Sequence, residues 1–232
     1  MHSTNSTSVN VIIPTRACKK RAASLRNAIR SIKQQKNVQV KIIVVINGNL
    51  YHDNIRDELT SDPQINCLFQ DEGNAPKAQA LGRGNVTEPY FCFLDDDDEL
   101  VSDSLLNRIQ ILEKNSDVDV VVCNGYREIN NAREIFYPRI EECEKDPLDA
   151  LFKQNWMASA SGIYRANSIG VEYFDDYARY MEWTYMAAKL ALTRRIHFVD
   201  VPCFVVKDTA GSISKSDDYL FGIIETFDKL LK

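Results

Sequence analysis

The chain has 232 residues, of which 44% are hydrophobic, and carries a formal net charge of −5 at pH 7. A chain of this length and apolar content can bury a sizeable core, and we expect one domain over residues 1–232. The acidic balance argues against a nucleic acid as the main partner, because proteins bind its phosphates through broad basic surfaces.

Apolar runs and helical periodicity alternate through the first half of the chain. Buried strands are predicted at residues 9–14, 40–46, 65–69 and 90–94, and helices at residues 52–59 and 77–83. A further helix after the first strand has an apolar face of Leu25, Ala28, Ile29 and Ile32, with Arg21, Arg26, Arg30 and Lys33 turned away. This alternation predicts a parallel sheet with right-handed crossovers. The strand ends at Thr15, Asn47 and Asp95 then lie along one edge and form a nucleotide-sized crevice.

The second half of the chain is less regular. A helix at residues 101–114 and a strand at 117–123 are followed by a predicted β-hairpin at 126–137 that turns at Asn130-Asn131. Beyond it we expect a short helix at 148–153, strands at 159–164 and 196–206, the latter broken at Pro202, and helices at 178–192 and 219–231.

The six cysteines are scattered without a CxxC pair, so the sequence indicates neither a zinc site nor a disulfide framework. Buried thiols are expected instead, which suits a reducing cytoplasm. The polar start has no apolar secretory core, and no run approaches the roughly 20 residues of a membrane span. We therefore expect a cytoplasmic protein without a transmembrane segment, with peripheral membrane attachment through the last helix as an option.

Five acidic residues, Asp95, Asp96, Asp97, Asp98 and Glu99, follow directly after the apolar strand at residues 90–94. Adjacent carboxylates repel one another, and a divalent cation held by oxygen ligands relieves that repulsion. A solvated turn is the ordinary interpretation of such a charge run and remains open. An EF-hand is disfavoured, because Leu100 and Leu106 stand where its loop needs Gly and Glu. The position after a buried strand favours a strand-end site.

Four segments resemble the GT-A nucleotide-sugar glycosyltransferases of family 2. They are Val11-Ile12-Ile13-Pro14-Thr15-Arg16, the run at 42–45 closed by Asn47-Gly48, residues 74–84, and Phe93-Leu94-Asp95-Asp96-Asp97-Asp98. Their order and spacing match across the first half, and the second half matches more weakly. The resemblance implies an α/β GT-A fold, with a Rossmann-like, mostly parallel central sheet flanked by helices and a smaller mixed acceptor-side region. Residues 9–123 would then bind the nucleotide-sugar and residues 124–232 the acceptor.

The family's Asp-x-Asp motif falls on Asp95-Asp96-Asp97. By that resemblance Asp97, together with Asp95, binds Mn²⁺ or Mg²⁺, and Asp95 and Asp96 hold the ribose or assist the metal. The donor-binding residues implied are Pro14, Thr15, Arg16, Asn47, Lys77, Asp95 and Asp96, with a UDP-sugar as the favoured donor. The metal would offset charge on the leaving diphosphate.

The pair Glu182-Trp183 resembles the family's Glu-Asp-Trp segment, which implies that Glu182 is the catalytic base. An exposed helix carboxylate is the competing interpretation, and Asp175 and Asp176 are fallback candidates. The implied reaction is one in-line displacement with inversion, in which Glu182 deprotonates a hydroxyl of a glycan or lipid-linked acceptor. Surface polysaccharide synthesis is one such setting. Trp156, Tyr164 and Trp183 either stack on sugar rings or belong to the core.

The chain departs from the family pattern at several positions. Ile46 replaces an Asp that often contacts the base, which leaves Asn47 as the available polar group, and Pro76 replaces a Gly. Thr209 stands where a metal-binding His is common, in a segment at 207–214 that we interpret as a lid; Asp208 is the substitute third ligand. These departures keep a catalytically inactive sugar-binding or scaffold protein as the alternative. An Asp-x-Asp phosphatase is disfavoured, because its aspartate would follow the first strand.

Overall fold

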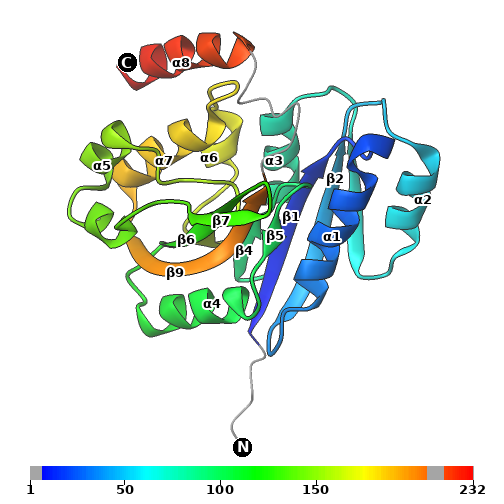
Figure 1. Cartoon of the computed structure of the whole chain (residues 1–232), viewed down its shortest axis with the longest axis horizontal. Helices are drawn as coiled ribbons and strands as arrows, with labels where there is room; N and C mark the ends of the chain where they lie inside the picture. Colours follow the sequence, from blue (N-terminus) through cyan, green and yellow to red (C-terminus); the bar gives the residue numbers. More distant parts are fainter. Residues whose placement is uncertain (1–6, 208–216, 232) are drawn as a thin grey trace, which may run out of the picture.

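The computed structural model describes residues 7–207 and 217–231. The strands are β1 (Ser8–Thr15), β2 (Gln39–Asn47), β3 (Ile65–Gln70), β4 (Tyr90–Phe93), β5 (Glu99–Leu100), β6 (Val120–Ile129), β7 (Ala132–Ile135), β8 (Gly162–Arg165) and β9 (Ile196–Lys207). The α-helices are α1 (Ala22–Lys33), α2 (Asp53–Ser61), α3 (Ala75–Gly84), α4 (Ser104–Lys114), α5 (Pro147–Lys153), α6 (Glu172–Asp175), α7 (Glu182–Thr193) and α8 (Asp217–Leu230). Short 3₁₀-helices lie at η1 (Lys19–Arg21) and η2 (Ile140–Glu144) (Figure 1).

The nine strands within the described residues form one sheet in the order β3-β2-β1-β4-β8-β6-β9-β5, with β7 paired to β6. The first four strands of this order are parallel to one another, and α1, α2 and α3 connect them in the chain. This arrangement confirms the predicted α/β fold and brings the carboxyl ends of β1, β2 and β4 to the same edge.

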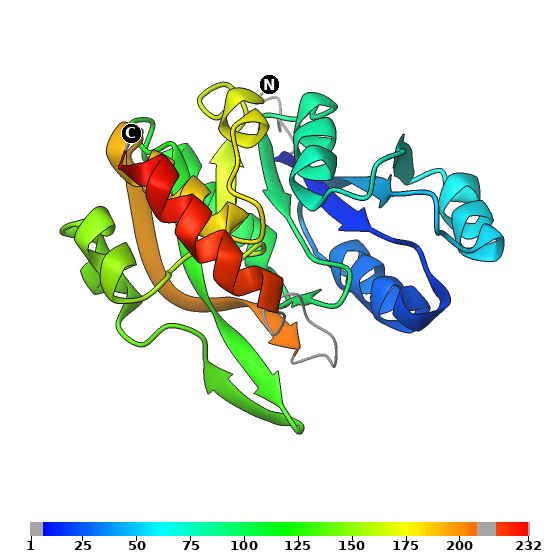
Figure 2. The same ribbon diagram turned by 90° about the horizontal axis from the view of Figure 1, so that it is seen from above.

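Both faces of the sheet are covered, because its side chains alternate between two apolar cores. On β1, Val11 and Ile13 join the core formed with α1, α2 and α4, whereas Ile12 joins the core formed with α3, α5, α6 and α7. Figure 2 shows α1 and α3 on opposite faces of the parallel strands. The sheet is therefore the middle of three layers.

The second half of the sheet is mixed and strongly curved. Strand β8 runs antiparallel to both β4 and β6, while the long, bent β9 is parallel to β6 (Figure 1). The predicted break at Pro202 is wrong, because β9 continues through it with a register shift opposite Asn124. Proline has no backbone N–H to donate, so a strand bulges there. Gly125 lets β9 approach closely, since a Cβ at this position would lie 2.4 Å from the Phe204 ring.

Several predicted boundaries in this half need correction. The helix expected from residue 178 begins only at Glu182, after Tyr180 adopts a φ of 68°. The strand expected from 159 begins at Gly162, and the helix expected from 101 begins at Ser104, after Asp103 with a φ of 60°. The hairpin turn is confirmed at Asn130 and Asn131, whose φ values are both positive. Backbone in this conformation ends regular structure in ways that hydrophobic periodicity does not reveal.

A buried arginine connects α4 to the segment just before β8. Arg108 on α4 is 1% exposed and donates hydrogen bonds of 3.0 Å to the carbonyl oxygens of Ser104 and Ala160. Its neighbours include the buried thiols of Cys123 and Cys203. A hydrogen bond from Cys123, together with Arg108, lowers the pKa of Cys203 to about 7. Four of the six cysteines are buried and the other two half-buried, and all six are free thiols.

In the ranges 7–207 and 217–231, no helix has the length and apolar character needed to cross a bilayer. The last helix, α8, contacts α7 and carries exposed Ile224 and Phe227.

Candidate functional site

The predicted meeting of strand ends is present at the carboxyl edge of the sheet. Thr15 ends β1, and its Oγ1 donates a 2.6 Å hydrogen bond to Oδ2 of Asp96, which follows β4. The Thr15 Oγ1 also accepts a 3.0 Å bond from the backbone N–H of Ala17, which fixes the hydroxyl. Asp96 is 8% exposed, and burial raises its pKa even though Thr15 and Arg21 oppose that shift.

Arg21 supplies the positive charge at this edge, and the sequence analysis missed it. Its Nη1 lies 3.2 Å from Oδ1 of Asp96 and also forms an ion pair with Oδ2 of Asp97. The prediction that Arg21 points outward from the first helix is wrong, because α1 begins only after it and Arg21 belongs to η1. The sequence did hold a signal for this role: Arg21 is a cation a few residues beyond the end of β1, and β1 lies beside β4, which leads into the acidic residues.

Asp95 and Glu182 bring the two halves of the chain together. Burial raises the pKa of Asp95 to about 7, and the negative charges of Asp97, Asp96 and Glu182 add to the rise, while Ser159 opposes it. Glu182 is the first residue of α7, and burial raises its pKa as well. The carboxylate chosen from the second half of the sequence therefore lies within electrostatic reach of the acidic strand end.

The last two acids of the run, Asp98 and Glu99, contact Lys207 at the end of β9. The backbone N–H of Lys207 donates a 3.2 Å bond to Oδ1 of Asp98, and the Lys207 ammonium pairs with Glu99. Burial, reinforced by Asp95 and Asp97, raises the pKa of Asp98. Asp98 and Glu99 thus attach β9 to the strand end, and Asp98 stays within electrostatic reach of Asp95 and Asp97.

Within the described residues, no group of three or more His, Cys, Asp or Glu side chains is placed to hold a metal ion. Asp208 and Thr209, with the rest of the lid segment expected at 208–214, lie outside the described residues. Asp95 and Asp97 nevertheless fit a hard divalent cation, because both offer carboxylate oxygens and the negative charge of Asp97 adds to the rise in the pKa of Asp95. Arg21 forms an ion pair with Asp97 at this site.

Asn47 holds the neighbouring loop at the end of β2. Its Oδ1 accepts a 2.8 Å bond from the backbone N–H of Asn74, whose side chain caps α3 and donates a 2.9 Å bond to the Tyr177 hydroxyl. Asn74 and Tyr177 were not predicted as site residues. Ile46 is fully buried, so Asn47 is the first polar side chain at this strand end.

The other predicted donor residues are more exposed. Lys77 is exposed and its ammonium lies 2.5 Å from Oε2 of Glu72. Arg16 is exposed but close enough to lower the pKa of Asp96, and Pro14 is half-buried in β1. Arg16 thus belongs to the same edge as Arg21, whereas the structure does not bring Lys77 to the acidic residues.

The aromatic candidates separate into core and surface. Trp156 and Tyr164 are fully buried, with the Trp156 Nε1 donating a 2.8 Å bond to the Pro147 carbonyl, so both are core residues. Trp183 is half-buried, with its ring centroid 5.3 Å from that of Phe93. Asp175 and Asp176 are both exposed. Asp176 accepts a 2.6 Å bond from the Tyr185 hydroxyl and pairs with Lys229, which connects α7 to α8.

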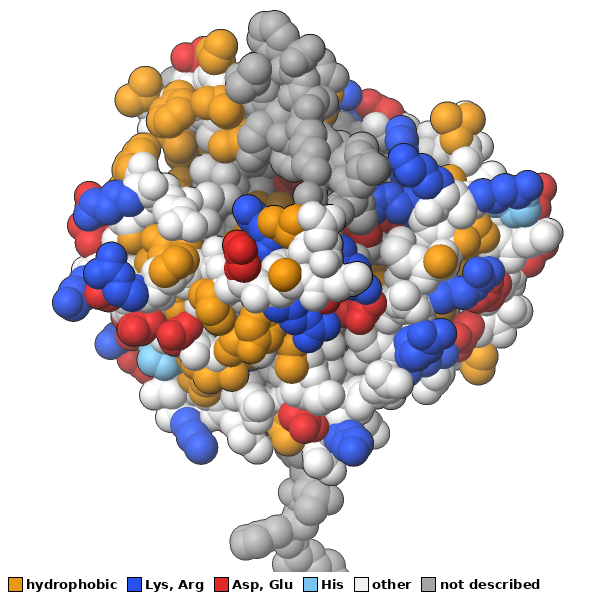
Figure 3. Space-filling model, viewed as in Figure 1, with side chains coloured by type: hydrophobic (Ala, Val, Ile, Leu, Met, Phe, Trp, Pro, Cys, Tyr) orange, Lys and Arg blue, Asp and Glu red, His pale blue; other side chains and the backbone are white. Residues whose placement is uncertain are grey.

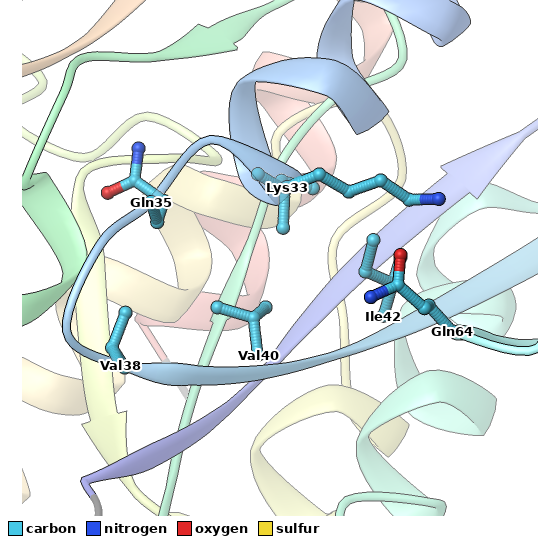
Figure 4. A pocket seen from close by; sticks show the side chains of 7 residues that line it. Lys33, Gln35, Val38, Val40, Ile42 and Gln64 are labelled. Carbon is cyan, nitrogen blue, oxygen red and sulfur yellow. The ribbon is translucent and has the colours of Figure 1, made fainter.

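A cavity of about 130 Å³ lies at the opposite end of β2. It is lined by Ile32, Lys33, Gln35, Val38, Val40, Ile42 and Gln64 (Figure 4). Over α1 and α2 the surface carries interspersed cations and acids (Figure 3), including the pairs Arg26–Glu58 and Lys33–Asp62. Because no carboxylate lines this cavity, it is not part of the acidic edge.

Comparisons with known proteins show the family and the fold. The family model "Glycosyl transferase family 2" matches residues 10–180. The uncharacterized glycosyltransferase RP339 of Rickettsia prowazekii is 30% identical over 134 residues, which are 56% of this chain and 39% of that protein. This chain thus spans about two fifths of that relative.

Solved structures of Staphylococcus aureus TarS share the fold. The complex of TarS 1-349 with UDP-GlcNAc superposes with a TM-score of 0.72 at 16% identity, covering 97% of this chain and 67% of that one. The UDP complex gives a TM-score of 0.66 at 15% identity, covering 97% and 66%. These likenesses confirm the predicted GT-A fold, and the family match extends over most of the sequence. The chain therefore belongs to glycosyl transferase family 2.

Proposed function

We propose that this chain transfers a sugar from a nucleotide-sugar donor, with a UDP-sugar as first choice, to a hydroxyl of a glycan or lipid-linked acceptor. The observation that carries the proposal is that the start of α7 packs on the end of β4: the Trp183 ring centroid lies 5.3 Å from that of Phe93, and the adjacent Glu182 is within electrostatic reach of Asp95. A donor held at the strand ends and an acceptor held by the second half would meet between these two carboxylates.

The first half offers the groups that a nucleoside diphosphate requires. Thr15 and Asn47 are polar side chains at adjacent strand ends, and Arg16 and Arg21 are cations beside them. Ligands of open α/β sheets bind outside the carboxyl ends of the strands. The UDP and UDP-GlcNAc complexes of TarS, which has the same fold, support UDP as the first nucleotide to test.

Asp97 and Asp95 would hold Mn²⁺ or Mg²⁺, with Asp208 as a candidate third ligand. A divalent ion there supplies charge neutralisation to the diphosphate as it leaves. Thr15 keeps Asp96 fixed beside these ligands, so the site would need little rearrangement of its backbone.

Glu182 is the proposed base. As the acceptor oxygen forms its bond to the anomeric carbon, the bond from that carbon to the phosphate oxygen breaks and the diphosphate takes the electron pair. The acceptor proton passes to the Glu182 carboxylate, and attack from the face opposite the leaving group inverts the configuration. Burial raises the pKa of Glu182 and so makes its carboxylate a stronger base than an exposed one.

The test is release of nucleoside diphosphate from UDP-, GDP- and dTDP-sugars, with and without Mn²⁺ and a mixture of candidate acceptors. We expect turnover of one donor class by the wild type and a large loss of rate in Glu182→Gln, with nucleotide binding retained. Nucleotide binding without turnover in the wild type would instead support the inactive binding protein. Absence of both would contradict the proposal.

A further inference from the structure

Arg21 neutralises the carboxylates that the proposed function assigns to the donor and its metal. Its guanidinium contacts Asp96 at 3.2 Å and also forms an ion pair with Asp97. The side chains of Arg21, Asp96 and Asp97 are 27%, 11% and 16% exposed, so the pairs are largely shielded from water. Shielded ion pairs are costly to break, because each separated charge must find another partner.

A free divalent cation that binds Asp97 must therefore displace Arg21. The displaced guanidinium would keep Asp96 as its partner but lose Asp97, which leaves a partly buried cation with less compensation. When the metal cation arrives together with a nucleoside diphosphate, the guanidinium exchanges Asp97 for another anionic partner. The diphosphate oxygens are anionic, and a guanidinium binds phosphate oxygens through paired N–H donors.

Only the side chain of Arg21 has to move in this exchange. The backbone N–H of Arg21 donates a 3.0 Å bond to the Cys18 carbonyl, and α1 starts at the next residue. The bond from Thr15 holds Asp96 from the other side. The backbone and Asp96 can therefore stay in place while the guanidinium changes its anionic partner.

We propose that Arg21 makes metal binding conditional on the nucleotide, because it occupies Asp97 until a diphosphate provides a replacement anion. This inference rests on the proposed function. It predicts positive coupling, in which UDP tightens Mn²⁺ binding and Mn²⁺ tightens UDP binding by the same factor. Coupling of this kind typically amounts to roughly 5- to 150-fold in affinity.

The experiment is calorimetric titration of the full chain with Mn²⁺ alone, UDP alone, and each in the presence of the other. Arg21→Gln removes the competing charge, so we expect Mn²⁺ alone to bind it roughly tenfold or more tighter than wild type, and the coupling with UDP to shrink. Lys19→Gln is the matched control, since Lys19 is an exposed cation in the same short helix and its loss changes the net charge equally. Arg21→Lys keeps the charge and should retain the weak binding of Mn²⁺ alone.

The outcomes separate this inference from the proposed function. Equal Mn²⁺ affinity in wild type and Arg21→Gln, or an equal gain in Lys19→Gln, overturns the exchange even if UDP binds with metal. If Arg21→Gln does not fold, tight binding of Mn²⁺ alone to wild type, with no further gain when UDP is present, overturns it. Failure of wild type to bind UDP at any Mn²⁺ concentration overturns the donor site itself.

Discussion

The first half of the chain (residues 9–123) and the second half (residues 124–232) hold their acidic side chains in different ways. In the first half, Asp96 accepts a hydrogen bond from Thr15 and forms an ion pair with Arg21, so its charge already has partners. In the second half, burial raises the pKa of Glu182, and a hydrogen bond from its own backbone N–H opposes that rise. Partners that can be exchanged, as at Asp96, suit a site that binds ions. A raised pKa, as at Glu182, suits a carboxylate that accepts a proton.

The largest expected effect is a loss of turnover when Glu182 is replaced. Glu182→Gln keeps the shape of the side chain but removes the proton acceptor, so the rate constant for transfer should fall roughly 100- to 10,000-fold. Binding of UDP, measured by calorimetry, should be retained because the donor-side residues are unchanged. Steady-state assays with the active donor check the rate.

The matched control for that change is Asp175→Asn, which removes an exposed carboxylate just before the same helix. We expect it to leave the transfer rate close to wild type. A loss of rate in Asp175→Asn that equals the loss in Glu182→Gln would mean that the base has been assigned to the wrong residue.

The second effect is on stability in the absence of metal. The pKa of Asp95 is about 7 in the folded chain and 3.8 in its ordinary state, so folding favours the protonated form. The stabilisation is therefore complete below about pH 4 and is lost as the pH rises toward 7, by about 3 kcal/mol. Urea unfolding in EDTA between pH 4.5 and pH 7 measures this slope, and Asp95→Asn should flatten it. If the free energy of unfolding of the wild type instead increases over this pH range, folding does not raise the pKa of Asp95.

The third effect tests the core that supports both halves. Arg108→Met would remove the hydrogen bond that the guanidinium donates to the buried Ala160 carbonyl and should lower the free energy of unfolding by about 1–3 kcal/mol. Arg30→Met, at an exposed position on α1, should change it by no more than about 0.5 kcal/mol. Urea denaturation at one pH compares the two, and equal effects would show that Arg108 is dispensable.

The smallest effect concerns the start of α3 on the donor side. Asn74→Ala removes the oxygen that accepts the 3.1 Å bond from the Lys77 N–H and should cost about 1 kcal/mol of stability. Asn74→Ser preserves a capping oxygen and should restore most of that loss. Thermal unfolding of both variants checks the order, which fails if serine is no better than alanine.

The sequence predicts the first half of the chain well because its strands are buried on both faces and appear as continuous apolar runs. The meeting of Thr15 with the acidic residues follows from parallel strand order alone. The contacts of Arg21 and Lys207 do not, because they depend on where η1 ends and on the path of the curved β9. The family resemblance led to Glu182; periodicity gave no reason to place it near Asp95. The boundaries at Glu182 and Ser104 were missed because residues with positive φ precede each helix closely.

The account depends most on the claim that the carboxyl edge around Asp97 binds the donor nucleotide with a metal. The direct measurement is titration of UDP into the wild type, Asp97→Ala and the surface control Asp117→Ala, each with and without Mn²⁺. We predict Mn²⁺-dependent binding by wild type and Asp117→Ala that Asp97→Ala weakens by at least about 100-fold, because the metal contributes several kcal/mol. UDP binding that is equally tight in Asp97→Ala, or the same without Mn²⁺, would contradict the account.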